Sequence, residues 1–267
     1  MKILIIGGGN MGLTYARSFL KSHVTDLSDL MILEKSEEKV KILESEQVGI
    51  IFSSPEECIN KADLVVLAVK PQDCGRLFED IKPHLGSQQL FLSIMAGVKI
   101  KSICNMLGVN KVIRAMPNLP AQIGMGMTAF TASDEVTRIE LVTVQNLLNT
   151  TGKAIFVENE ALIDAATAVS GSGPAYVYFY MNAMIDAAKA LGFSESEAEL
   201  LVGQTFMGSA HLLNRDQLSC KDWIAKVSSK GGTTEAAMNI YNENGLNDKI
   251  KEGLFKAHKR AIELGQE

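Results

Sequence analysis

Three glycines near the amino terminus have the spacing of a phosphate-binding loop. Gly7, Gly9 and Gly12 follow an apolar run and precede a helical pattern from Leu13, so they satisfy G-x-G-x-x-G between a strand and a helix. The first glycine of such a loop permits the tight turn, the second lets a pyrophosphate approach the backbone, and the third allows close packing of helix and strand. The helix N-terminus offers N–H groups to the phosphates. We therefore predict that a dinucleotide binds the loop formed by Gly7, Gly8, Gly9, Asn10, Met11 and Gly12.

An acidic residue closes the second apolar run. Glu34 lies about 20 residues beyond Gly12, the separation expected for an acid that hydrogen-bonds the adenosine ribose of a dinucleotide. Because a carboxylate repels a 2′-phosphate, Glu34 favours NADH over NADPH. Lys35 and Ser36 follow at once and would hold a 2′-phosphate if Glu34 turned away, so NADPH stays open. A solvated strand end is the other interpretation of Glu34.

Three further turns lie at the ends of predicted strands, at residues 68–71, 95–97 and 116–118. In parallel α/β sheets ligands bind at the carboxyl ends of the strands, so we expect these turns to border the same crevice as the glycine loop. Ordinary turn chemistry explains any one of them alone. The predicted cofactor contacts in these turns are Ala68, Val69, Lys70, Pro71, Ala96, Gly97, Met116, Pro117 and Asn118.

Two segments in the second half of the chain are rich in glycine and small hydroxyl residues. One covers residues 170–176 and the other residues 228–234, and each precedes a predicted helix. The sequence Gly-Gly-Thr-Thr in the second segment can present backbone N–H groups and hydroxyls at a helix start, which suits a small carboxylate or phosphate. Simple helix capping by Thr233 or Thr234 explains the same sequence equally well.

The distribution of apolar runs predicts an α/β fold with two domains. Short apolar runs alternate with helical patterns as far as residue 157, which is typical of a Rossmann-type, doubly wound and mostly parallel sheet. Helical patterns alone follow from residue 159. We therefore expect a dinucleotide-binding domain at residues 1–158 and an all-helical domain at residues 159–267. The predicted strands are 2–6, 30–33, 64–69, 90–94, 112–116, 127–130 and 154–157, and the predicted later helices are 174–191, 195–213, 233–244 and 247–264.

The overall composition narrows the class of protein. The chain has 267 residues, 46% of them hydrophobic, and a net charge of −5, which describes a globular protein and argues against nucleic-acid or membrane partners. Its four cysteines are Cys58, Cys74, Cys104 and Cys220. They lack metal-ligand spacing, so we expect reduced thiols, no metal and a cytoplasmic protein. The first apolar run begins almost at Met1, which leaves no room for a targeting segment, and no run is long enough for a membrane span.

The chain resembles the pyrroline-5-carboxylate reductase family over essentially its whole length. The glycine loop, the turn at 68–71, the segment at 114–118 and the two hydroxyl-rich segments occur in the family's order and spacing. The second of those segments usually reads Ser-Pro-Gly-Gly, and Lys230 replaces its proline. The resemblance implies NADH- or NADPH-dependent reduction of 1-pyrroline-5-carboxylate, a cyclic imine, to L-proline in the last step of proline biosynthesis. The helical half is small and rich in apolar residues, which predicts a homodimer formed through the C-terminal domain. The resemblance implies larger rings of dimers.

The resemblance further implies which residues act on the substrate. Thr234 would hydrogen-bond the ring nitrogen, which makes it the catalytic residue. Ser229 and the backbone N–H groups of Gly232, Thr233 and Thr234 would hold the substrate carboxylate. Ser172 would line the opposite wall. Orientation of the two reactants would be the enzyme's main contribution.

Two other classes stay open on the sequence alone. A relative that reduces another small imine or oxidises a β-hydroxyacid would share the glycine loop and the helical second domain. The β-hydroxyacid enzymes use a catalytic lysine in the helical half, and this chain has no convincing candidate there. A non-catalytic NAD(P)-binding regulator would also keep the loop. The intact Thr233-Thr234 pair argues against a regulator, and Lys230 favours it.

Overall fold

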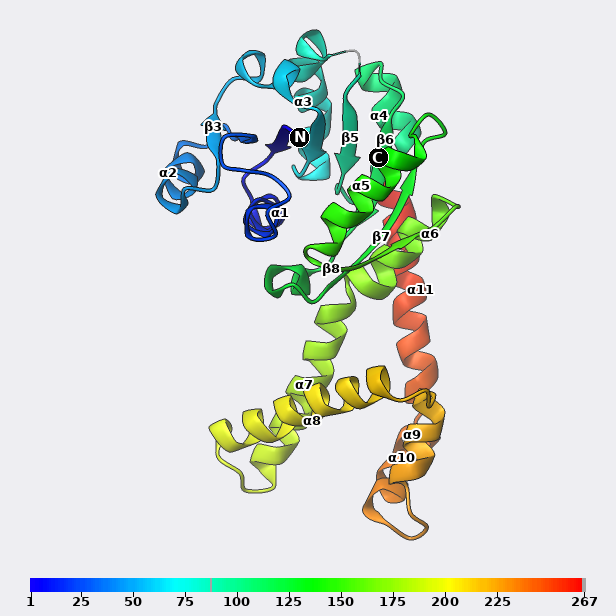
Figure 1. Ribbon diagram of the computed structural model, residues 1–267. Coiled ribbons are helices and arrows are strands. Elements are labelled where there is room, and N and C mark those ends of the chain that lie inside the picture. The colour runs from blue at the N-terminus through cyan, green and yellow to red at the C-terminus, as the bar shows by residue number, and fades with distance from the viewer. Residues whose placement is uncertain (87, 266–267) are drawn as a thin grey trace. The chain divides into compact units, whose positions relative to one another are not determined.

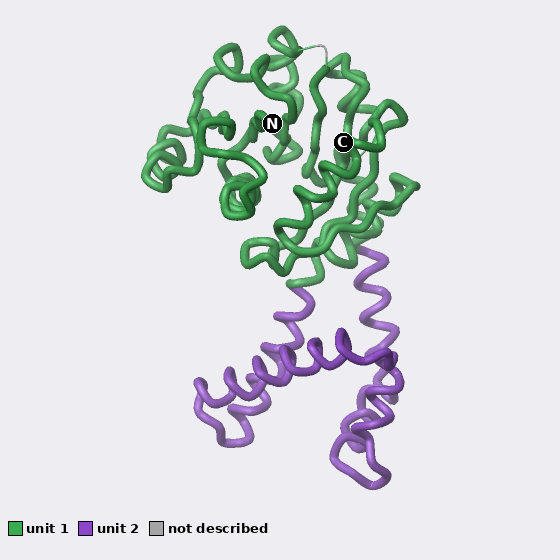
Figure 2. Tube along the Cα trace, in the orientation of Figure 1, with its two compact units in different colours: residues 1–174, 257–267 green, residues 175–256 purple. Residues whose placement is uncertain are grey.

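The computed structural model describes residues 1–86 and 88–265, and the chain forms two compact units. Residues Met1–Pro174 and Ala257–Glu267 form the first, which we call the sheet unit, and Ala175–Lys256 form the second, the helical unit. Figure 2 colours the two units separately. The boundary between the dinucleotide-binding domain and the helical domain, placed between residues 158 and 159, stays a prediction. Residues 266 and 267 of the predicted second domain lie outside the described residues.

The sheet unit contains an eight-stranded sheet with the order β3-β2-β1-β4-β5-β6-β7-β8 (Figure 1). All neighbouring strands are parallel except β6 and β7, so the predicted mostly parallel sheet is confirmed. The order from β3 to β6, which reverses between β1 and β4, is that of dinucleotide-binding sheets. The strands are β1 Ile3–Ile6, β2 Leu30–Leu33, β3 Ile50–Phe52, β4 Leu64–Leu67, β5 Leu90–Ser93, β6 Val112–Met116, β7 Gly126–Ala132 and β8 Gly152–Phe156.

Side chains alternate across the strands and give the sheet two buried faces. The helices of this unit are α1 Asn10–Lys21, α2 Glu37–Glu46, α3 Cys74–Ile81, α4 Ile100–Leu107, α5 Arg138–Asn149 and α6 Ala161–Ala166. Ile3 and Ile5 of β1 belong to a core shared with α1 and α5, whereas Leu4 and Ile6 belong to a core shared with α3 and α4. Helices on both faces explain why the central strands are apolar throughout.

The strand β3 is missing from the sequence prediction. It has only three residues at the edge of the sheet, and its side chains are exposed or half-buried. Gly49, with φ of +133°, turns the chain into it. So short a run at an edge lacks the continuous apolar pattern that identifies a buried strand.

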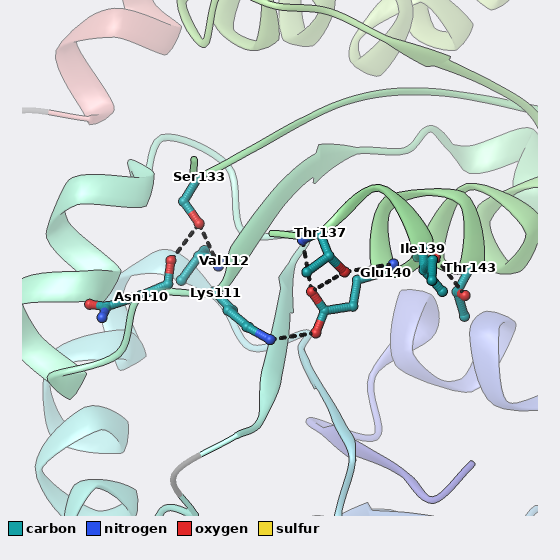
Figure 3. A network of polar contacts seen from close by, with 8 residues as sticks. All are labelled: Asn110, Lys111, Val112, Ser133, Thr137, Ile139, Glu140 and Thr143. Carbon is teal, nitrogen blue, oxygen red and sulfur yellow. Dashed lines mark hydrogen bonds and ion pairs between the residues drawn. The ribbon is translucent and has the colours of Figure 1, made fainter. Parts of the chain in front are cut away.

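A polar network fixes the start of α5 against β6, as Figure 3 shows. Thr137 and Glu140 form a reciprocal capping box, in which the Thr137 N–H donates to Glu140 Oε2 at 2.8 Å. Lys111 Nζ lies 2.8 Å from Glu140 Oε1. Burial by itself would raise the pKa of the Glu140 carboxyl, but the hydrogen bonds from Lys111 and Thr137 hold that pKa below its usual value.

The helical unit confirms the predicted helix boundaries to within about two residues. The later helices are α7 Gly173–Ala190, α8 Glu195–Arg215, α9 Cys220–Val227, α10 Thr233–Glu243 and α11 Leu246–Leu264. Ser194 and Glu197 form a capping box at the start of α8. The short helix α9 was not predicted, although Ser219 and Asp222 form a capping box at its start. Among the described residues, no helix combines the length and apolar character needed to cross a membrane.

Candidate active site

The glycine loop joins β1 to α1 at the carboxyl edge of the sheet. Gly7 has φ of +106°, and a Cβ there would lie 2.8 Å from the carbonyl oxygen of Ala68. A Cβ on Gly12 would clash with the carbonyl oxygen of Gly7. In contrast, a Cβ on Gly9, the N-cap of α1, would meet open space. The loop is therefore packed against the protein at its two ends and open at Gly9, where a pyrophosphate would need to approach.

The carboxylate of Glu34 is held beside this loop by three backbone N–H donors and one ion pair. Oε2 accepts from the N–H of Gly8 at 2.9 Å, and Oε1 accepts from the N–H groups of Lys35 and Ser36, both at 2.9 Å. Lys39 Nζ lies 3.6 Å from Oε2, and Glu34 is only 8% exposed. Glu34 therefore holds a carboxylate in a fixed position and anchors the glycine loop through the Gly8 N–H. This structural role was not predicted from the sequence.

The side chain of Lys35 is directed to Asp80, at 2.5 Å between Nζ and Oδ2. This hydrogen bond holds the pKa of the Asp80 carboxyl below its usual value. A 2′-phosphate that recruited Lys35 would have to compete with that ion pair. The N–H of Ser36, which precedes α2, is already bound to Glu34.

The other predicted turns lie at the same edge as the glycine loop, because β1, β4, β5 and β6 run parallel. Ala68 continues β4, and its N–H donates to the Ile6 carbonyl at 2.9 Å. The following Lys70 is exposed, and Pro71 begins a short 3₁₀ turn. After β5, Gly97 has φ of +78°. The contacts of these turns with a cofactor stay predictions.

Arg114, in the middle of β6, is fully buried and pairs with two carboxylates. Its Nη1 lies 3.1 Å from Glu160 Oε1, and its Nη2 lies 2.6 Å from Asp164 Oδ1. Glu160 Oε1 also accepts from the N–H of Ile100, the first residue of α4, at 2.8 Å. The three charges therefore join β6, α4 and α6. This cluster was not predicted from the sequence, although an arginine inside an apolar strand is a signal that could have indicated it.

The first hydroxyl-rich segment begins in a π-helical turn, residues 167–171, within the sheet unit. The N–H of Ser172 donates to the carbonyl of Thr167 at 2.8 Å, which is the wide i to i+5 spacing of such a turn. Asn118 Nδ2 donates to the Ser170 carbonyl at 3.1 Å. The predicted substrate residue Ser172 and the predicted cofactor residue Asn118 are thus linked through one short segment.

The second hydroxyl-rich segment forms the loop between α9 and α10 in the helical unit. Gly232 is the N-cap of α10 and Thr233 its first residue, so the interpretation of these threonines as simple helix caps is wrong. The Gly232 N–H donates to the Ser229 carbonyl at 3.0 Å, and a Cβ on Gly232 would lie 2.5 Å from Ser229 Oγ. Glu235 Oε2 accepts from the Gly231 N–H at 2.7 Å.

These contacts determine which hydrogen-bonding groups of this loop are available to bind a ligand. The N–H of Gly232, predicted to hold a carboxylate, is already occupied within the loop. The N–H groups of Thr233 and Thr234 lie in the first turn, where helix geometry provides no helical acceptor. Thr234 is half-buried, and Ser229 is exposed.

Family models match both parts of the chain. Residues 2–97 match a model described as NADP oxidoreductase coenzyme F420-dependent, and residues 160–264 match one described as pyrroline-5-carboxylate reductase dimerisation. Together with the strand order and the glycine loop, these matches define an NAD(P)-dependent oxidoreductase with a helical dimerisation domain.

Full-length relatives identify the family within that class. The chain is 34% identical to the pyrroline-5-carboxylate reductase of Pseudomonas aeruginosa over 267 residues, which are 100% of this chain and 97% of the relative. It is also 34% identical to that of Aquifex aeolicus, over 99% of this chain and 97% of the relative. The chain therefore belongs to the pyrroline-5-carboxylate reductase family.

Solved structures agree over nearly the whole chain. A pyrroline-5-carboxylate reductase from Coxiella burnetii matches with a TM-score of 0.90 and 31% identity, covering 98% of each chain. The pyrroline carboxylate reductase of Plasmodium falciparum, solved with NADP bound, matches with a TM-score of 0.90 and 27% identity, covering 99% of this chain and 98% of the other.

Proposed function

We propose that this protein is a pyrroline-5-carboxylate reductase, which uses NADH or NADPH to reduce 1-pyrroline-5-carboxylate to L-proline in the last step of proline biosynthesis. The observation that carries the proposal is the 34% identity to the P. aeruginosa reductase over the whole chain. The intact Gly-Gly-Thr-Thr sequence at the start of α10 supports it, because its first-turn N–H groups and hydroxyls suit a carboxylate and a ring nitrogen.

The residues at the carboxyl edge of the sheet fit a dinucleotide. The open space beside Gly9 and the first-turn N–H groups of α1 suit the pyrophosphate. The turns at residues 68–71 and 96–97, together with Met116 and Pro117, would hold the nicotinamide half. When bound, the cofactor supplies the hydride, and the protein supplies binding and orientation.

Glu34 supports a preference for NADH over NADPH. Its carboxylate is fixed beside the glycine loop, so a 2′-phosphate would meet a negative charge, whereas a ribose hydroxyl could donate to Oε2. Glu34→Gln removes the charge and keeps the shape. The ratio of kcat/KM for NADH to that for NADPH should fall at least about 10-fold in this variant. A wild-type enzyme that already prefers NADPH would contradict this role of Glu34.

In the proposed reaction the imine carbon gains a hydride and the ring nitrogen keeps a proton. The Thr234 hydroxyl would hydrogen-bond that nitrogen. Ser229 and the N–H groups of Thr233 and Thr234 would hold the substrate carboxylate, with Lys230 adding a nearby cation. Ser172 of the sheet unit is proposed as a further substrate contact. Because such an imine protonates readily, orientation rather than strong acid catalysis would be the main contribution of these residues.

A homodimer formed through the helical unit is part of the proposal. None of the residues in α7, α9 and α10, all of which the structure describes, is buried. Phe179 is 80% exposed, Leu191 is 82% exposed and Leu200 is 70% exposed. Apolar side chains exposed in this number mark a protein interface, and the match to the dimerisation model points to a second copy of the chain. Larger rings of dimers are the further expectation. A mass in solution equal to one chain would count against both.

The proposed location is the cytoplasm, with no nucleic-acid partner. Cys58, Cys74, Cys104 and Cys220 are free thiols, as expected in a reducing compartment. Burial raises the pKa of Cys58 to about 11, which keeps that thiol protonated and unreactive. The net charge of −5 is unfavourable for contact with nucleic acid.

Oxidation of NADH and of NADPH in the presence of 1-pyrroline-5-carboxylate, with proline identified as the product, tests the proposal. Thr234→Val should lower kcat/KM by about 10- to 100-fold, the range for losing one hydrogen bond to a group that carries charge. Thr143→Val is the matched control, because the Thr143 hydroxyl donates only to the Ile139 carbonyl on α5. Equal activity of the two variants would refute the role of Thr234. Dinucleotide binding without turnover by the wild type would refute the reductase itself.

A further inference from the structure

Alternate residues at the end of β6 contact one short segment of the chain. Arg114 pairs with Glu160 and Asp164. Two residues on, Met116 packs in a small core with Ile163, and its side chain lies 3.6 Å from where a Cβ of Gly171 would stand. Residues i and i+2 of a strand lie on the same face, so one face of β6 packs against residues 160–171.

Asn118 continues this series two residues beyond Met116. Its Nδ2 donates to the Ser170 carbonyl at 3.1 Å, and its Oδ1 accepts from the N–H of Met127 at 2.8 Å. The half-buried carboxamide therefore spans from the start of β7 to the π-helical turn. Both the nitrogen and the oxygen of the amide are hydrogen-bonded within the protein. A side chain that served only to contact the cofactor would not need these bonds.

The bond to Ser170 has a specific cause in the sequence. In an α-helix the carbonyl of residue 170 would accept from the N–H of residue 174, but residue 174 is proline and has no N–H. Asn118 supplies a donor to that carbonyl. Pro174 lies in the first turn of α7, so the contact fixes the segment that leads from the π-helical turn through Ser172 into this helix.

We propose that Asn118 is a positioning residue for the serine-glycine segment, residues 170–173, and acts on binding of the imine rather than of the dinucleotide. The proposal rests on the proposed function, because it assigns Ser172 to the substrate. It replaces the predicted cofactor contact of Asn118 by a role exerted through the Ser170 carbonyl.

Asn118→Asp is the sharpest test. An ionised aspartate keeps an acceptor for the Met127 N–H but presents an oxygen to the Ser170 carbonyl, so only the second contact breaks. Asn149→Asp is the matched control, because Asn149 Oδ1 likewise accepts a backbone N–H, from Ala154 at 2.9 Å, and the same charge is added elsewhere. Asn118→Ala removes both contacts without adding charge.

Steady-state kinetics and dinucleotide titration separate the outcomes. Both Asn118 variants should raise KM for 1-pyrroline-5-carboxylate about 10-fold, the consequence of leaving a backbone carbonyl unpaired, and leave Kd for NADH and NADPH within about 2-fold of the wild type. Asn149→Asp should change neither. A rise in dinucleotide Kd with an unchanged KM for the imine would overturn the proposal in favour of a cofactor contact.

Hydrogen exchange provides a readout that needs no turnover. Backbone amides of residues 167–173 should exchange faster in Asn118→Asp than in Asn149→Asp, since only the first variant releases the turn. Equal exchange in the two variants would overturn the positioning role. If the two variants differ in exchange as expected but the wild type reduces no 1-pyrroline-5-carboxylate, the proposed function alone is refuted.

Discussion

Replacing Arg114 with methionine should destabilise the protein by about 3 to 5 kcal/mol, the usual cost of removing one partner from a buried ion pair. Arg114 is fully buried, and the Asp164 side chain is 7% exposed, so the variant leaves a carboxylate with little access to water. Glu160 is 30% exposed and can turn toward solvent, which confines most of the cost to Asp164. The loss is large against a typical stability of about 5 to 15 kcal/mol.

Urea unfolding measures this cost as a shift of the midpoint at constant slope. Arg17→Met is the matched control: Arg17 is 58% exposed and pairs with Glu46 at the surface, so its loss should cost at most about 1 kcal/mol. The double variant Arg114→Met/Asp164→Leu should recover about 1 to 3 kcal/mol, because it also removes the stranded carboxylate. If Arg114→Met lowers the free energy of unfolding no more than Arg17→Met does, the buried ion pair does not have the proposed importance for stability.

Two other perturbations test the glycine loop and the start of α5. Gly12→Ala places a methyl group against the Gly7 carbonyl and should raise Kd for NADH at least about 10-fold. Gly75→Ala in α3 is the control, because a Cβ there meets open space and Kd should not change. Equal Kd values in the two variants would disprove the role of close packing at Gly12. Hydrogen bonds, chiefly from Lys111, hold the pKa of Glu140 below its usual 4.5, so its stabilisation is complete above that value and is lost as pH falls through the lower folded pKa. The difference in urea midpoint between wild type and Glu140→Gln should therefore shrink between about pH 7 and about pH 3, and a constant difference would contradict this.

Features set by local patterns could be predicted from the sequence. The spacing of Gly7, Gly9 and Gly12 indicates the loop because each glycine answers a short-range steric need. The capping box at Ser194 and Glu197 is likewise visible within four residues. Continuous apolar runs identify the central strands, since helices bury both faces of the sheet. The predicted fold class is confirmed by the sheet, and the family resemblance is confirmed by relatives that match the whole chain. Both predictions rest on such local patterns.

Contacts between distant residues could not be predicted in this way. Arg114 and Asp164 are 50 residues apart, and Asn118 and Ser170 are 52 apart. Nothing in the local sequence of either partner specifies the other. Glu34 shows the limit most clearly: its spacing from the loop indicates its neighbourhood, but the bond to the Gly8 N–H, 26 residues away, emerges only when β1 and β2 pair.

The most direct test of the proposed function is the transfer of deuterium to 1-pyrroline-5-carboxylate from NADH or NADPH labelled at C4 of the nicotinamide ring. We expect the wild type and Thr143→Val to form proline that carries one deuterium at the former imine carbon, and we expect this reaction to be strongly slowed in Thr234→Val. Dinucleotide binding without labelled proline would contradict the account and leave another imine, or a non-catalytic dinucleotide-binding role, as the function of the chain.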